Sequence, residues 1–180
     1  PVYAAVWYPA VNPEDAKEEI TYQISDVHPL FPEMPIQGQA IRDAAADVAG
    51  GPYPLVVFSS GLAGWAHSNS FLCEHLASHG FVVISWEPRG EAWGGDFWEG
   101  AATRPLDTQL VIDFADELTA NDDELAGVID TDRIGIAGHS SGGWTALMGG
   151  GAQFDWGWCD ANPDLIAGNA LSNCNQFVPH

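Results

Sequence analysis

Short apolar runs alternate along the chain with stretches in which apolar residues recur at helical spacing. The runs at 2–8, 54–59, 81–85 and 134–137 are rich in valine, isoleucine and aromatic residues, which favours buried β-strands. Three helices are predicted: one capped by Ser68 or Asn69 and stopped by Gly80, one with apolar residues recurring over 106–118, and one over 144–148.

The order strand, helix, strand, helix, strand, helix predicts an α/β fold with a doubly wound, mostly parallel sheet. Right-handed crossovers place the helices of such a fold on both faces of the sheet. Ligands bind beyond the carboxyl ends of the strands, where Ser60, Glu87 and Ser140 fall in this sequence. The length permits a real core, and we expect a single domain over residues 1–180.

Two segments have weaker patterns. Residues 10–33 contain prolines and acidic residues with little periodicity, which predicts an excursion that includes a short helix. Residues 36–48 are interpreted as a further helix that ends at Gly50 and Gly51. The long loop from Glu87 to Gly100 is rich in aromatic residues, which either line an acyl pocket or pack into the core.

The most informative stretch joins the last predicted strand to the last predicted helix: Gly138-His139-Ser140-Ser141-Gly142. It has the G-x-S-x-G pattern of a nucleophile elbow, a strained turn that exposes its serine above the sheet. Glycine suits the two flanking positions because neighbouring backbone leaves no room for a Cβ. A plain glycine-rich turn or a phosphate loop is the alternative, but the G-x-G-x-x-G and Gly-Lys-Ser/Thr patterns are absent from this stretch. We therefore predict that Ser140 is a catalytic nucleophile.

A serine nucleophile needs hydrogen-bond donors where negative charge develops on the substrate oxygen. We expect one donor to be the backbone N–H of Ser141, which directly follows the nucleophile. The second is predicted in the loop after the 54–59 strand, where the backbone N–H of Leu62 follows Gly61. A flexible glycine turn without a catalytic role is the alternative for this loop.

The histidines suggest a metal site only superficially. His67, His75 and His79 lack the H-E-x-x-H spacing of a zinc site, so no metal is expected. His139 lies inside the elbow, and its side chain is expected to point away from the site and to support the turn.

The net charge of the chain limits the kinds of partner that it can bind. There are 25 acidic and 5 basic residues, which gives a formal net charge of −20. Such a surface repels nucleic acids and anionic membranes. No apolar run has the length of a membrane span. The acidity suits a secreted or periplasmic protein, and the alternative is that it only keeps a cytoplasmic protein soluble.

With these motifs in place, the chain resembles the α/β-hydrolase superfamily, in particular the dienelactone-hydrolase-like and platelet-activating-factor-acetylhydrolase-like serine esterases. The resemblance is carried, in order, by residues 6–10, 54–64, 104–107 and 132–143. The family pattern usually has His-Gly where this chain has Ser60-Gly61. The resemblance implies hydrolysis of a small-molecule or lipid-like carboxylic ester through an acyl-enzyme on Ser140, with no cofactor.

The catalytic acid and histidine are difficult to place. In this superfamily they follow the serine in the order acid, histidine. After Ser140 the chain offers Asp155, Asp160 and Asp164 as acids, and its only later histidine is His180. We therefore expect the fold to be incomplete at the C-terminus, the chain to be a portion of a longer catalytic domain, and both groups to lie in further sequence or in a separate chain.

Two other functions remain open from the sequence. A peptidase or an acyltransferase would use the same elbow, and amide turnover compared with ester turnover separates these from an esterase. A catalytically silent hydrolase-fold module that binds a partner is the non-enzyme alternative, and the missing histidine favours it.

The cysteines give a first testable prediction. Cys159 and Cys174 lie in a polar segment and are hypothesised to form a disulfide, whereas Cys73 lies in a helical pattern as a buried thiol. Mass spectrometry after alkylation should then show one modified thiol in the denatured, unreduced protein and three after reduction. Alkylation of all three without reductant would contradict the pairing.

Overall fold

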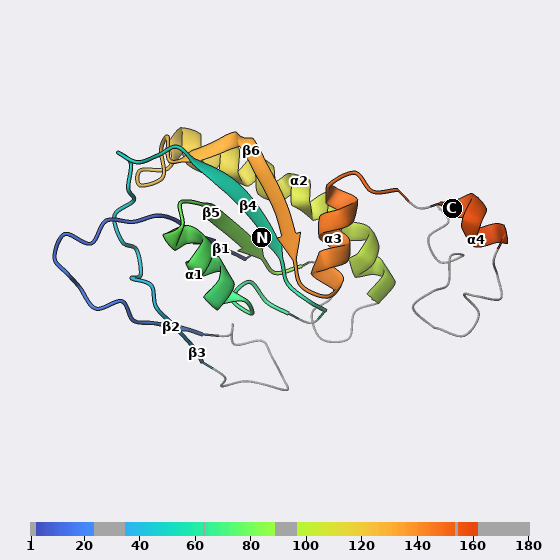
Figure 1. Cartoon of the computed structure of the whole chain (residues 1–180), viewed down its shortest axis with the longest axis horizontal. Coiled ribbons are helices and arrows are strands. Elements are labelled where there is room, and N and C mark those ends of the chain that lie inside the picture. The colour runs from blue at the N-terminus through green and yellow to red at the C-terminus, as the bar shows by residue number, and fades with distance from the viewer. Residues whose placement is uncertain (1–2, 24–34, 63, 89–96, 154, 162–180) are drawn as a thin grey trace.

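The computed structural model describes residues 3–23, 35–62, 64–88, 97–153 and 155–161. Its centre is a four-stranded sheet in the order β1-β5-β4-β6 (Figure 1). The strands are β1 (Ala4–Trp7), β4 (Tyr53–Ser59), β5 (Val82–Trp86) and β6 (Ile129–Gly138). Strand β4 runs parallel to both β5 and β6, whereas β1 is antiparallel to β5. The predicted α/β fold with a mostly parallel sheet is confirmed.

Helices lie on both faces of the sheet, as the crossover rule requires. The helices are α1 (Ser70–Ser78), α2 (Phe97–Asn121), α3 (Ser141–Gly149) and α4 (Trp156–Ala161). Figure 1 shows α1 against one face and α2 against the other, with α3 beside α2 at the end of β6. Helix α2 begins earlier than predicted and includes Pro105.

Alternation along the central strands gives the sheet two apolar faces. Leu55 and Val57 of β4 are fully buried against the α2 face, where Val111 is also buried. Phe58 of β4 points to the opposite face and packs with Cys73 of α1. Because successive side chains of a strand alternate, one seven-residue strand supplies both cores. Each such apolar side chain contributes about 1.5–3 kcal/mol of transfer free energy.

Strand β6 departs from the buried strand predicted over 134–137. Arg133, Ile134 and Gly135 are exposed, and Ile134 has 38% of its surface accessible. The reason is topological: in the described part of the chain β6 is the outermost strand and pairs with β4 alone. A run of apolar residues therefore identified the strand correctly but not its degree of burial.

The helix predicted over 36–48 is wrong. This segment holds β3 (Ile36–Gly38), which pairs antiparallel with β2 (Ile20–Tyr22), followed by turns. The side chain of Glu74 on α1 explains why this segment pairs as a strand. Its carboxylate accepts hydrogen bonds from the Gln39 backbone N–H (2.9 Å) and from the Tyr22 hydroxyl (2.6 Å). The described residues 10–23 hold β2 and no helix, and the rest of the segment in which a short helix is predicted lies outside the described part.

Two predictions concern residues outside the described part or side chains within it that are not described. The aromatic pocket of the 87–100 loop depends largely on residues 89–96, which lie outside the description. The same holds for Cys174, and the side chain of Cys159 is not described, so their disulfide stays a prediction. Cys73 is a buried free thiol as expected, and burial raises its pKa to about 12. In the part of the chain that is described, no helix is long and apolar enough to cross a membrane.

A cluster of aromatic rings closes around His67, just before α1. The Tyr22 ring stacks on the imidazole at 4.8 Å between centroids, and Tyr3 and Trp7 meet it edge-on. His67 is 8% exposed, and its Nε2 lies 3.3 Å from the Tyr3 hydroxyl. Burial lowers the pKa of His67 below its ordinary value of 6.5, and the charge of Arg42 lowers it further.

This cluster predicts a pH dependence of stability. Since the folded protein keeps His67 neutral while the unfolded chain binds a proton near pH 6.5, acidification favours the unfolded state. The free energy of unfolding should therefore fall as the pH drops below about 6.5. Urea titrations at several pH values should show a smaller fall for His67→Gln, with the exposed His75→Gln as the matched control. Equal pH slopes for the wild type and His67→Gln would contradict this prediction.

Candidate active site

The backbone at Ser140 has the strained geometry of an elbow. Ser140 lies between the end of β6 and the start of α3, with φ 56° and ψ −119°. Positive φ is unfavourable for a residue with a side chain and costs on the order of 1–3 kcal/mol. The serine is exposed at the carboxyl edge of the sheet, as predicted for an accessible nucleophile.

The glycines on either side of Ser140 are required by close backbone contact. A Cβ on Gly142 would lie far inside contact distance of the Ser59 carbonyl, and one on Gly138 would collide with the carbonyl of Gly142. Both obstacles are backbone atoms, which do not rotate away as a side chain would. The Ser59 carbonyl also accepts a hydrogen bond from the His139 N–H at 3.1 Å. The turn is thus built directly on the end of β4.

The loop after β4 lies beside the serine. A Cβ built on Gly61 would be 3.5 Å from the Cβ of Ser140 and 3.2 Å from Nδ1 of His139. Leu62 follows in the same loop and leaves 51% of its side chain exposed. Ser141 begins α3 on the other side of the nucleophile. The structure therefore brings the segments of all three predicted site residues together, and their catalytic roles stay predictions.

Arg104 of α2 lies behind this loop, which the sequence did not reveal. The side chain is buried, and its guanidinium donates to the backbone carbonyls of Ser60 (2.5 Å) and Gly61 (3.1 Å). In the sequence, Arg104 stands out only as part of the 104–107 stretch. These two partners are backbone carbonyls, which every residue carries, so the sequence could not point to them.

No histidine of the described residues is brought to Ser140 as a catalytic base. His139 lies against Gly61, and no shared hydrogen bond between its ring and Ser140 is observed. Asp155 is exposed at the start of α4, and its carboxylate accepts a hydrogen bond from the backbone N–H of Trp158 at 2.8 Å. The side chain of Asp160 and all of Asp164 and His180 lie outside the description. The described side chains also include no group of three or more acidic, histidine or cysteine residues that could hold a metal ion.

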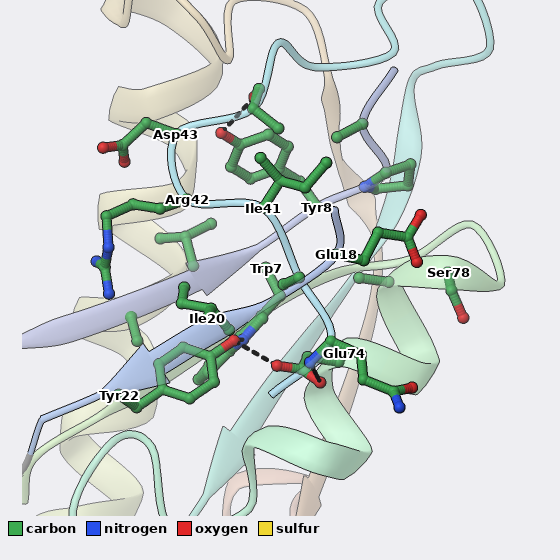
Figure 2. Close-up of a pocket in the computed structure, with 18 of the residues that line it drawn as sticks. Trp7, Tyr8, Glu18, Ile20, Tyr22, Ile41, Arg42, Asp43, Glu74 and Ser78 are labelled. Atoms are coloured by element: carbon green, nitrogen blue, oxygen red, sulfur yellow. Dashed lines mark hydrogen bonds between the residues drawn. The ribbon is translucent and has the colours of Figure 1, made fainter. Parts of the chain in front are cut away.

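Two cavities of about 470 Å³ each lie away from the elbow. Figure 2 shows the first, which is bounded by β1, the 39–44 segment and α1. Three of its polar side chains are hydrogen-bonded in a row: Trp7 donates to the Tyr22 hydroxyl (2.9 Å), which donates to Glu74. The second lies between β1 and α2 and is lined by Tyr3, Ala4, Trp86, Asp107, Leu110, Val111 and Phe114. Neither cavity is lined by Ser140.

Comparison with known proteins gives consistent matches. The model of the prolyl oligopeptidase family matches residues 67–158. The "Putative esterase YitV" of Bacillus subtilis (strain 168) is 30% identical over 140 residues, which cover 71% of this chain and 50% of that protein. A ferulic acid esterase structure from Streptomyces cinnamoneus is similar with a TM-score of 0.61 at 24% identity, covering 82% of this chain and 47% of that one.

These matches confirm the predicted resemblance to α/β-hydrolase esterases and the fold. The family match includes the elbow and α1 but begins after the Gly61 loop. The chain spans about half the length of each of the two similar proteins.

The elbow geometry predicts that alanine at two neighbouring glycines has very different effects on stability. Gly142→Ala should destabilise the protein by about 3 kcal/mol or more, because the new methyl group collides with the Ser59 carbonyl. The matched control is Gly143→Ala, whose methyl group would meet the Gly138 carbonyl at an ordinary 3.7 Å. Its stability should stay within about 1 kcal/mol of the wild type. Urea denaturation of both variants measures the difference, and equal stabilities would refute this account of the turn.

Proposed function

This chain belongs to the prolyl oligopeptidase family, and from that premise we propose that it is part of a serine hydrolase that cleaves carboxylic esters through an acyl-enzyme on Ser140. The observation that carries the proposal is the positive φ of Ser140 between two glycines that cannot accept a Cβ. A turn of this kind holds the serine hydroxyl clear of the sheet.

In the proposed reaction, the Ser140 oxygen attacks the ester carbonyl and forms a tetrahedral intermediate. The negative charge on the former carbonyl oxygen is stabilised by the backbone N–H groups of Leu62 and Ser141. The N-terminus of α3 adds a favourable dipole at the same place. The alcohol leaves with a proton, and water then attacks the acyl-enzyme to release the acid and restore the serine.

The acid and the histidine of this reaction are proposed to lie outside residues 1–180, in further sequence or in a separate chain. The support is that the two similar proteins are about twice as long as the stretch this chain covers, and that no histidine base is placed at Ser140 among the described residues. The histidine accepts the serine proton and returns it to the leaving alcohol. No cofactor takes part in this scheme.

We propose a small-molecule or lipid-like ester as substrate. The names of YitV and of the Streptomyces enzyme support ester chemistry, and the exposed apolar side chain of Leu62 offers an apolar contact beside the serine. The net charge of −20 disfavours nucleic acids and anionic membranes as partners. A secreted or periplasmic location is proposed on the same acidity, with the cytoplasm as the alternative.

A second candidate function is peptide hydrolysis, which the name of the matching family favours. The same elbow and oxyanion donors would serve an amide, because both reactions pass through a tetrahedral oxyanion. Acyl transfer differs only in the group that attacks the acyl-enzyme. A catalytically silent binding module would retain the fold and lose turnover altogether.

The proposal predicts ester turnover that depends on Ser140. The full-length protein should hydrolyse p-nitrophenyl esters faster than the matching p-nitroanilides, and Ser140→Ala should lower kcat/KM about 10³-fold or more. A fluorophosphonate should label the wild type at Ser140. The control is Ser78→Ala, which removes a hydroxyl from the exposed end of α1 and should leave the rate unchanged.

Faster turnover of the anilides would favour the peptidase. Full-length protein that neither turns over nor accepts the fluorophosphonate would favour the binding module. Ester turnover that Ser140→Ala retains would refute the role of Ser140.

A further inference from the structure

Arg104 is a charged side chain in the interior of an acidic protein. It lies on α2 and has only 1% of its surface exposed. Removing a guanidinium from water is costly unless hydrogen bonds replace the lost hydration. A buried arginine is therefore expected where hydrogen bonds to its guanidinium replace that hydration.

The contacts of Arg104 converge on the loop that follows β4. Its Nη1 donates to the Ser60 carbonyl at 2.5 Å, and its Nη2 donates to the Gly61 carbonyl at 3.1 Å. Nη1 also lies 3.4 Å from Oγ of Ser59. The planar guanidinium has its donors in a fixed fork, so binding two successive carbonyls fixes their direction as well as their position.

The direction of a carbonyl determines the direction of the N–H that follows it. In a trans peptide unit the C=O and the N–H lie in one plane and point in opposite directions. The carbonyl of Gly61 and the N–H of Leu62 belong to the same peptide unit. By holding the Gly61 carbonyl toward α2, Arg104 turns the Leu62 N–H away from α2.

We propose that Arg104 is a positioning residue for catalysis: its guanidinium, bound to the Ser60 and Gly61 carbonyls, fixes the peptide unit that presents the Leu62 N–H to the oxyanion at Ser140. This inference rests on the proposed function, because it assigns a role within the same reaction. Arg104 touches neither the substrate nor the nucleophile, and it acts through the loop.

The opposite side of the loop is also fixed. Gly61 lies against the elbow, where an added Cβ would be 3.5 Å from the Cβ of Ser140. The Gly61 carbonyl accepts a second hydrogen bond, from the Gly64 N–H at 2.9 Å, which closes a tight turn. The peptide unit is thus held between the guanidinium on one side and the nucleophile turn on the other.

The expected effect is on the chemical step rather than on substrate binding. An oxyanion exists only in the transition state and the intermediate, so a misdirected donor lowers kcat and leaves KM nearly unchanged. Loss of one oxyanion donor typically costs about 10²–10³ in kcat, and a loosened donor should cost about 10–10².

The test uses the full-length protein with Arg104→Met and Arg104→Lys. Methionine approximates the length of the arginine stem without its donors, whereas lysine keeps the charge but cannot bind two carbonyls in a fork. The matched control is Thr108→Val, which removes the hydrogen bond from a buried hydroxyl to the Arg104 carbonyl on the same helix and leaves the guanidinium contacts in place.

Rates must be expressed per reactive serine. Titration with a fluorophosphonate ester counts the molecules that retain a competent Ser140, so a variant that merely folds poorly shows fewer sites with a normal kcat per site. We expect kcat per titrated serine to fall about 10- to 100-fold in both Arg104 variants, with KM changing less than about threefold, and Thr108→Val to stay within about twofold of the wild type.

Normal kcat per titrated serine in the folded Arg104→Lys variant would overturn the inference, whatever happens to Arg104→Met. An equal loss in Thr108→Val would also overturn it, because the effect would then belong to the packing of α2. These outcomes differ from failure of the proposed function, in which Ser140→Ala would retain ester turnover.

Discussion

The contact between two backbone segments without intervening side chains is the constraint on which the site depends. The carbonyl at the end of β4, on Ser59, receives the His139 N–H and leaves space at Gly142 only for a hydrogen atom. Strands β4 and β6 are far apart in the sequence but are paired in parallel along their length. Their pairing ends at the place where the chain must turn, and this turn sets the conformation of Ser140.

A second layer of support comes from α2. Its apolar side chains Val111 and Ala115 pack on the buried face of β4 and β5. On the same helix, Arg104 reaches the loop at the end of β4. Packing over a whole sheet face thereby holds a guanidinium in place with little freedom, because interiors are packed to nearly crystalline density. The loop is thus held by a side chain that the packed core positions, in addition to its own hydrogen bond from the Gly64 N–H to the Gly61 carbonyl.

The sequence was most informative where one physical rule dominates. The apolar runs located β4 and β5 to within one residue at each end, and the elbow was recognisable because only glycine tolerates backbone at that distance. Prediction failed where long-range partners decide. Residues 36–48 have helix-forming composition, yet Glu74 and the pairing with β2 hold their first part as a strand. The contacts of Arg104 with the Ser60 and Gly61 carbonyls were hidden for the same reason, since every residue carries a carbonyl.

The positive φ of Ser140 has a consequence for when the elbow takes its shape. An isolated peptide with this sequence would relax to an ordinary conformation, since nothing local offsets the strain. The β4–β6 pairing imposes it, and closing the long loop between these strands costs entropy. A newly made or partly unfolded chain therefore lacks the elbow conformation of Ser140. Under the proposed mechanism, acyl chemistry would be confined to molecules in which β4 and β6 are paired.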